Sequence, residues 1–216
     1  MKTEFKKIKQ SNVIAIGGMI ASGKTTLMHN LAKRLNCELI DEIDPNDEIQ
    51  NVLLKALYEK KNEVAPAVFQ LYFFLTRFEN YKRATKDDSL FLVDRTVFED
   101  RLFAHRNMAK DPVTFGFYDV LWTNKIHELI YSVGIPKLYI IIDIEWDLFK
   151  ERLFERDRNI ETDNYKINED YFKNLWEGYT DYLVQICKTY GINYIVVSAS
   201  DEQDAKLDKI IDYLNT

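Results

Sequence analysis

Residues 17–26 read GGMIASGKTT, a run that holds three of the seven glycines in this 216-residue chain. Positions 18–25 fit the pattern G-x-x-x-x-G-K-[S/T], which is typical of loops that bind nucleotide phosphates. The β-branched run NVIAI at 12–16 precedes the loop, and leucines at helical spacing follow it within 24–36. A short buried strand, the loop and a helix are the context that this pattern requires. The stretch therefore predicts a nucleoside triphosphate site.

Each part of this loop has an expected role in holding the phosphates. Glycines let the backbone wrap tightly, so that successive N–H groups point at an anion, and the following helix adds its positive end. Lys24 is expected to reach the β- and γ-phosphates of ATP, and the Thr25 hydroxyl is expected to bind Mg²⁺. The residues predicted to bind ATP here are Gly18, Met19, Ile20, Ala21, Ser22, Gly23, Lys24, Thr25 and Thr26.

Short apolar runs alternate with helical patterns along the rest of the chain. We expect further strands at 37–40, 90–93, 137–144 and 193–199, and helices at 44–60, 65–84, 113–133, 146–158 and 169–190, the last despite Gly178, with a loop at 159–168 and a final amphipathic helix. Strands that are continuously apolar and alternate with helices favour a parallel sheet covered on both faces. The prediction is an α/β P-loop NTPase fold, with a five-stranded parallel sheet, in one domain over 1–216.

Composition excludes several classes of protein. The formal net charge of −6 argues against a broad nucleic-acid-binding face, which is ordinarily basic. The N-terminal segment MKTEFKKIKQ is basic, but the apolar run after it is too short for a signal peptide or a membrane helix. Cys37 and Cys187 have no metal-like spacing and are expected to be reduced. We therefore expect a cytoplasmic protein that binds neither nucleic acid nor membrane.

Charged residues follow two of the predicted strands directly. Asp41 and Glu42 come after 37–40, and Asp94 and Arg95 come after 90–93. Residues just past the carboxyl ends of parallel strands line the crevice where ligands bind. A carboxylate at Glu42 suits an alcohol acceptor, which must lose a proton, whereas a phosphate acceptor needs no such base. Asp94 is a candidate to hold Mg²⁺ or its water, and Arg95 is a candidate to fix the acceptor oxygen.

A third cluster of charges lies at the end of the helix predicted over 146–158. Arg152 and Arg156 are four residues apart on one helical face, and Arg158 follows them. Arginines beside a loop can close over a site and neutralise charge during phosphoryl transfer.

This ordered set resembles the deoxynucleoside kinase family, which includes deoxycytidine, deoxyguanosine and bacterial deoxyadenosine kinases, over nearly the whole chain. The resemblance implies ATP-dependent phosphorylation of a deoxynucleoside 5′-hydroxyl in nucleotide salvage, with Mg²⁺, by a homodimer. Glu42 matches the general base, and Arg95 and Arg152 match catalytic arginines. Tyr58 and Glu161 match ligands of the sugar 3′-hydroxyl. Phe69 matches the residue that stacks on the base, Gln70 matches the one that hydrogen-bonds it, and Arg156 and Arg158 belong to a lid over about 156–166.

The resemblance also bears on the choice of base. Arg77 lies seven residues after Gln70, and Asp100 lies six after Asp94. Kinases for purine deoxynucleosides and deoxycytidine carry an Arg–Asp pair at these places, so deoxyadenosine or deoxyguanosine is the first choice and deoxycytidine the next. A bidentate arginine can also donate to purine N7 or O6.

Among the places where the chain departs from the family pattern, two bear on the acceptor pocket. The Pro-Val that usually follows the base is Ile43-Asp44 here. The second base-stacking aromatic would fall at Ala104, with Phe103 one position earlier, so Phe103 is the candidate for that contact.

Two other functions use the same scaffold. A nucleoside monophosphate kinase similar to thymidylate kinase would act on dNMPs and depend little on Glu42. A non-catalytic P-loop regulatory protein would bind nucleotide without transferring phosphate, and would leave Gln70 and Arg77 unexplained. If the alcohol-kinase hypothesis is right, Glu42, Arg95 and Arg152 should converge where a γ-phosphate would lie.

Overall fold

The computed structural model describes residues 8–42, 47–59, 64–86, 88–155 and 165–215. Within them a parallel five-stranded sheet has the strand order β2-β3-β1-β4-β5. Its strands are β1 (Val13–Gly18), β2 (Glu38–Ile40), β3 (Phe91–Asp94), β4 (Leu138–Asp143) and β5 (Tyr194–Ser198). Both neighbours of β1 are in register with it, since Ile16 pairs with Asp94 and Gly18 pairs with Ile142. The predicted fold class is confirmed.

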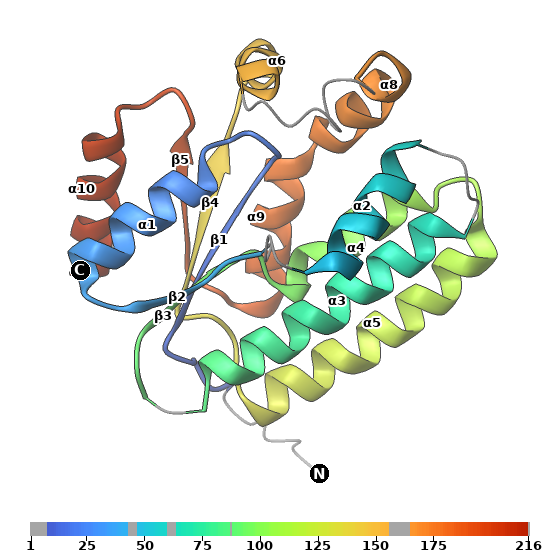
Figure 1. The fold of residues 1–216 in the computed structure, drawn as a ribbon. Helices are drawn as coiled ribbons and strands as arrows, with labels where there is room; N and C mark the ends of the chain where they lie inside the picture. The colour runs from blue at the N-terminus through green and yellow to red at the C-terminus, as the bar shows by residue number, and fades with distance from the viewer. Residues whose placement is uncertain (1–7, 43–46, 60–63, 87, 156–164, 216) are drawn as a thin grey trace.

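Helices cover both faces of the sheet (Figure 1). Two of them contact each other on one face, α1 (Lys24–Leu35) and α10 (Gln203–Leu214). The other face carries α3 (Ala65–Ala84), α4 (Val97–Asn107), α5 (Pro112–Ser132) and α9 (Tyr179–Tyr190). Helix α2 (Glu48–Glu59) packs on α3, and α6 (Trp146–Glu155) and α8 (Tyr165–Trp176) lie beyond the carboxyl ends of the strands.

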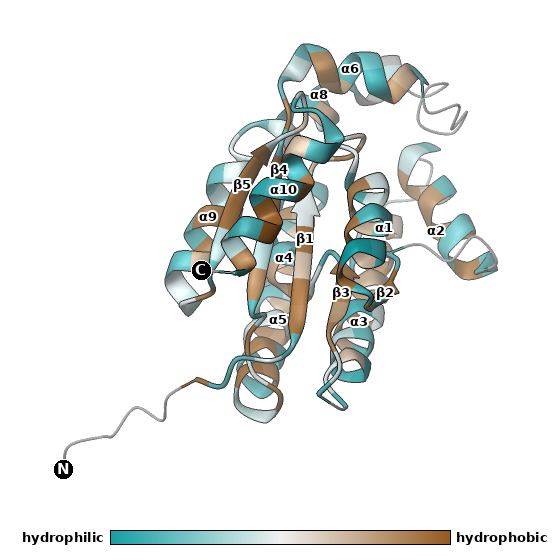
Figure 2. Ribbon diagram, turned by 90° about the vertical axis from the view of Figure 1, so that its left-hand side faces the viewer, coloured by the Kyte–Doolittle hydropathy of each residue, from teal (hydrophilic) through white to brown (hydrophobic). Residues whose placement is uncertain are grey.

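The core is built from the strands and the apolar faces of these helices. Every residue of β1 and β3 is buried, and in β4 only Asp143 at the end is exposed. Continuous apolar strands are stable in this arrangement because helices remove both faces of the sheet from water. In Figure 2 the strands accordingly run as hydrophobic bands between mixed helices. No helix in the described part of the chain is both long and apolar enough to cross a membrane.

Two of the predicted element boundaries are wrong. The segment 169–190 is not one helix, because α8 ends at Trp176 and α9 begins at Tyr179. Between them Gly178 has φ 71°, a left-handed conformation that ends helical continuity and that glycine adopts without a steric penalty. The predicted loop 159–168 is also too long, since α8 already begins at Tyr165.

Candidate active site

The phosphate-binding loop connects β1 to α1 and needs its glycines for two different reasons. Gly23 has φ 90°, where a side chain would be strained. Gly18 has an ordinary φ but little room, because an added Cβ would lie 2.8 Å from Ser22 Oγ and 3.0 Å from the Ile142 carbonyl oxygen. Ala21 also lies in the left-handed region, with φ 59°. The loop therefore bends tightly against β4 and delivers the backbone to the amino end of α1.

Lys24 is folded back over its own loop. Its Nζ donates hydrogen bonds to the carbonyl oxygens of Gly18 and Met19, each at 3.1 Å. Burial, with the Arg95 charge adding to it, lowers the pKa of Lys24 to about 8. A phosphate would supply the anionic partner that this buried ammonium lacks in the loop.

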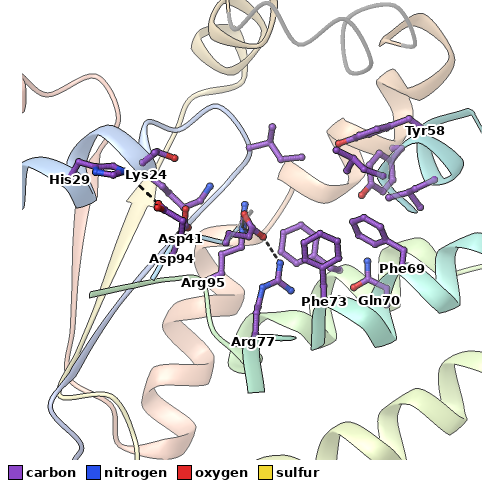
Figure 3. Close-up of a pocket in the computed structure, with 17 residues that line it drawn as sticks. Lys24, His29, Asp41, Tyr58, Phe69, Gln70, Phe73, Arg77, Asp94 and Arg95 are labelled. Atoms are coloured by element: carbon purple, nitrogen blue, oxygen red, sulfur yellow. Dashed lines mark hydrogen bonds and ion pairs between the residues drawn. The ribbon is translucent and has the colours of Figure 1, made fainter. Parts of the chain in front are cut away.

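A cavity of about 340 Å³ opens beside this loop. Figure 3 shows Lys24 and Asp94 at one end, Phe69 and Gln70 at the other, and Arg95 with Arg77 between them. Its volume is in the range of small-molecule sites. The residues that line it are Ile20, Lys24, Thr25, His29, Asp41, Glu42, Leu54, Leu57, Tyr58, Phe69, Gln70, Phe73, Arg77, Asp94, Arg95, Phe103 and Tyr171. Residues predicted separately for the triphosphate and for the acceptor thus share one cavity.

Glu42 lines this cavity and is held by Arg95 and Arg77, which lie between its two ends (Figure 3). Arg95 Nε lies 3.0 Å from one carboxylate oxygen, and Arg77 Nη2 donates to the other. Burial by itself would raise the pKa of Glu42, but the charges of Arg95, Arg77 and Lys24 outweigh it and lower the pKa to about 2. Without a ligand, Glu42 is therefore ionised, and its two carboxylate oxygens accept from Arg95 and Arg77.

Arg95 is fixed by its backbone as well as by its side chain. Its φ is 61°, unusual for a residue with a side chain, and its N–H donates to the Ile16 carbonyl at 2.9 Å. The guanidinium lies over the Phe103 ring at 4.7 Å. Its Nη1 donates to Glu99 at 3.2 Å and also to the Tyr179 hydroxyl. Phe103 lines the cavity, where its contact with a substrate stays a prediction, and its ring also supports Arg95.

The far end of the cavity presents polar groups that have no partner within the described residues. Gln70 is 1% exposed, and neither its side-chain oxygen nor its nitrogen is hydrogen-bonded there. Arg77 pairs with Asp100, yet Arg77 Nε and Asp100 Oδ2 are also unpartnered in this part of the structure. Buried polar atoms left without partners are costly, so they mark where a polar ligand would bind. Phe69 packs on Phe73 beside them, with ring centroids 4.5 Å apart.

The residues predicted to hold Mg²⁺ fit that ion. Asp94 is buried, and its Oδ1 has no partner among the described residues. Burial raises the pKa of Asp94 to about 6, so a cation would favour its ionised form. Thr25 lies on the same cavity wall with an exposed side chain. Mg²⁺ ordinarily takes one or two protein ligands, with phosphate oxygens and waters completing its shell.

Arg152 lies near the loop but is not part of the cluster around Glu42. It donates to the carbonyl oxygens of Ser22, at 3.4 Å, and Ala199, at 2.9 Å. Of the three residues expected to converge at a γ-phosphate, Glu42 and Arg95 contact each other, while Arg152 contacts the backbone of the phosphate-binding loop. Arg156, Arg158, Glu161 and the departure at Ile43-Asp44 lie outside the described residues.

Several residues of the site were not predicted from the sequence, and four of them support Arg95 or line the acceptor end of the cavity. Phe73 lies between Gln70 and Arg77 on one face of α3, so helical spacing had the signal for it. Glu99 lies four residues after Arg95, which is the spacing of an ion pair on a helix. Tyr171 and Tyr179 come from the segment misread as one helix, and no local pattern marks them.

Comparison with known proteins agrees with this geometry. A family model for deoxynucleoside kinase matches residues 14–216. The chain is 38% identical over 218 residues to the uncharacterized MG268 homolog of Mycoplasma pneumoniae, covering 100% of this chain and 95% of that protein. It is 33% identical over 173 residues to a deoxyguanosine kinase of Lactobacillus johnsonii, covering 77% and 74%.

A solved structure supports the same fold. Deoxyadenosine kinase from M. mycoides with bound dATP superposes with a TM-score of 0.77 at 23% sequence identity, covering 94% of this chain and 100% of that one. The family match spans almost the whole length of the chain, including the phosphate-binding loop and the residues that line the cavity. The chain belongs to the deoxynucleoside kinase family.

Proposed function

We propose that this protein transfers the γ-phosphoryl group of ATP to the 5′-hydroxyl of a deoxynucleoside, with a purine base preferred. The observation that carries the proposal is the position of Glu42 in the shared cavity. It contacts Arg95 and Arg77, which lie between Lys24 of the phosphate-binding loop and Gln70 (Figure 3), and the Gln70 amide has no partner among the described residues. A carboxylate at that point suits an acceptor that must lose a proton.

In the proposed reaction Glu42 accepts the 5′-hydroxyl proton while the 5′-oxygen forms a bond to the γ-phosphorus and the bond to ADP breaks. A carboxylate with a pKa of about 2 is a weak base. The bound acceptor must therefore draw Arg77 away from Glu42, which removes one cation and raises the pKa of Glu42. A purine base that takes up hydrogen bonds from Arg77 would do so.

Other residues would neutralise the phosphates. Arg95 orients the 5′-oxygen, Lys24 meets the β- and γ-phosphates, and Thr25 with Asp94 would hold Mg²⁺. When bound, that ion would offset the negative charge that develops on the phosphate oxygens. Arg152 is proposed to support the transition state from its place on the loop. Arg156 and Arg158 would close a lid over 156–166.

At the acceptor end, Phe69 and Phe103 would contact the base, and Gln70 with the Arg77–Asp100 pair would read its edge. Tyr58 and Glu161 would hold the 3′-hydroxyl and crowd a ribose 2′-hydroxyl. The names of the relatives support a purine first and deoxycytidine next: a deoxyguanosine kinase, a deoxyadenosine kinase of Dictyostelium discoideum, and a deoxyadenosine/deoxycytidine kinase of Bacillus subtilis.

We also propose a homodimer located in the cytoplasm. The support for the dimer is an apolar strip on α5, where Val113, Phe117 and Val120 are 68%, 77% and 63% exposed. Their spacing of four and three residues puts them on one face of the helix. Monomeric proteins rarely leave large contiguous apolar patches in water, and a second copy of α5 would cover this one.

The test of the reaction is transfer from labelled ATP to deoxyadenosine, deoxyguanosine, deoxycytidine, thymidine and their monophosphates, with Glu42→Gln beside the natural protein. We expect transfer to a purine deoxynucleoside that falls by roughly 100- to 10,000-fold in the variant, the usual worth of a general base. Transfer to a monophosphate that is indifferent to the substitution would instead establish a nucleoside monophosphate kinase. Nucleotide binding with no transfer would establish a non-catalytic protein.

A further inference from the structure

Arg95 lies between two carboxylates that differ sharply in their surroundings. Glu42 contacts it from the cavity and has a side chain that is 17% exposed. Glu99 contacts it from the opposite side and has a side chain that is 0% exposed. One carboxylate faces the acceptor and the other faces the protein interior, so they are not equivalent partners for the arginine.

The position of Glu99 is set by two elements behind the cavity. It lies in the first turn of α4, four residues after Arg95, and its Oε2 accepts hydrogen bonds from Arg95 Nη1, at 3.2 Å, and from the Tyr179 hydroxyl of α9. The same oxygen would lie 3.2 Å from a Cβ added at Gly17, so the carboxylate packs against the end of β1. Neither Glu99 nor Tyr179 lines the cavity.

The reaction changes the charge on one of these carboxylates. When Glu42 takes a proton it becomes neutral, and Arg95 loses the negative charge that balances its own. At the same moment Arg95 must stay in place, because it orients the 5′-oxygen. A buried guanidinium without a carboxylate partner is unfavourable and would shift toward other groups. Glu99 does not line the cavity, so its contact with Arg95 does not involve the groups that face the acceptor.

We propose that Glu99, fixed by the Tyr179 hydroxyl, is the permanent counter-ion of Arg95 and positions its guanidinium for phosphoryl transfer. The inference rests on the proposed function, in which Arg95 orients the 5′-oxygen. Tyr179 completes a closed triangle, since its hydroxyl accepts from Arg95 Nη1 and donates to Glu99 Oε2. The triangle occupies Nη1, and Nε faces Glu42, so the guanidinium plane is defined at two of its nitrogens.

A role in positioning makes a specific kinetic prediction. Glu99→Gln keeps the shape of the side chain but removes its charge, and we expect kcat to fall by roughly 10- to 100-fold, the cost of a catalytic group displaced by about an ångström. The acceptor KM should stay within about twofold, because Glu99 does not touch the cavity. Tyr179→Phe keeps the ring beside Phe103, and should lower kcat by about fivefold, the worth of one hydrogen bond.

A matched control is available on the same helix. Arg101 of α4 pairs with Asp119 of α5 away from the cavity, so Asp119→Asn likewise removes a carboxylate from a paired arginine. It should leave kcat and KM unchanged. A KM increase with an unchanged kcat in Glu99→Gln, or equal losses in Asp119→Asn, would overturn the proposal.

A second measurement does not depend on turnover. In arginine side-chain NMR spectra of the full chain, assigned with Arg95→Lys, the Arg95 guanidinium should give separate Nη signals because its rotation is blocked. We expect those signals to merge in Glu99→Gln and to persist in Asp119→Asn. Persistence in Glu99→Gln would overturn the counter-ion role. Absence of transfer by the natural protein to every acceptor would refute the proposed function, while these spectra still decide the role of Glu99.

Discussion

At the scale of single residues, the site depends on how carboxylates and arginines share charge. Arg77 contacts both Glu42 and Asp100, and therefore connects the part of the cavity that would read the base to the residue that would accept the proton. The pKa of Glu42 is low because three cations surround it, and Arg77 is one of them. A substitution at the base-reading end should therefore change the pKa of Glu42.

This coupling gives a pH prediction. Arg77→Met removes a cation that stabilises the ionised carboxylate, so the pKa of Glu42 should rise from about 2. The acidic limb of kcat/KM against pH should move to higher pH, and the preference for a purine over thymidine should shrink. Arg101→Met is the control, because Arg101 pairs with Asp119 instead. An acidic limb that stays in place would show that Arg77 does not tune Glu42.

Another residue-scale prediction concerns the sugar. If Tyr58 crowds a 2′-hydroxyl, Tyr58→Phe should relax the preference for deoxyribose over ribose acceptors. The measurement is the ratio of kcat/KM for deoxyadenosine and adenosine. A ratio that equals that of the natural protein would remove Tyr58 from the sugar site.

At the scale of elements, Gly178 divides one apolar helical pattern into two helices. The break lets α8 contribute Tyr171 to the cavity while α9 contributes Tyr179 to the support of Arg95. An uninterrupted helix would keep both segments on a single axis. The left-handed residue is therefore part of how the site is assembled.

Two glycine substitutions test this point as a pair. Among the described residues, apart from each glycine's own chain neighbours and helix backbone, no atom lies within 4 Å of a Cβ added at Gly178 or at Gly116 in α5, so both sites have room for alanine. Gly178→Ala should lower the free energy of unfolding by about 1–2 kcal/mol, because φ 71° is strained for a residue with a side chain. Gly116→Ala should raise it by about 0.5–1 kcal/mol, since alanine favours a helix interior. Urea denaturation measures both, and changes of the same sign would refute the assigned conformation of Gly178.

At the scale of the whole molecule, the fold carries buried acids that folding disfavours in their charged form. Burial raises the pKa of Asp94 to about 6 and that of Asp100 to about 7, whereas in the unfolded chain each is near about 3.9. Between these values the folded chain holds protons that the unfolded chain has released. Stability must then fall as pH rises from about 4 to about 7. We expect the protein without ligand to bear this loss of stability because the same buried carboxylates bind cations.

The corresponding measurement is urea denaturation across that pH range without nucleotide or Mg²⁺. The free energy of unfolding should decrease with rising pH, and the decrease should be smaller in Asp100→Asn by about 3 kcal/mol, which is what a pKa raised from about 3.9 to about 7 implies over this range. Other groups that titrate over the chain cancel in the comparison of the two proteins. Parallel curves would show that the pKa of Asp100 is not raised by burial.

The sequence by itself determined the features that depend on short-range patterns. The phosphate-binding loop, the parallel sheet and the span of α3 all follow from local spacing, because glycines, β-branched runs and helical periodicity act within a few residues. The candidate residues Glu42, Asp94 and Arg95 could be placed at strand ends, since parallel strands bring their carboxyl ends to one edge.

Only the tertiary structure decided which charged side chains contact each other. Three contacts depend on how separate elements pack: Arg77 with Glu42, Arg152 with a backbone carbonyl, and Tyr179 with Arg95. The break at Gly178 belongs here too, because the apolar pattern runs through it and glycine is compatible with either conformation. Contacts across 35 to 84 positions of sequence are set by packing, and no local pattern specifies them.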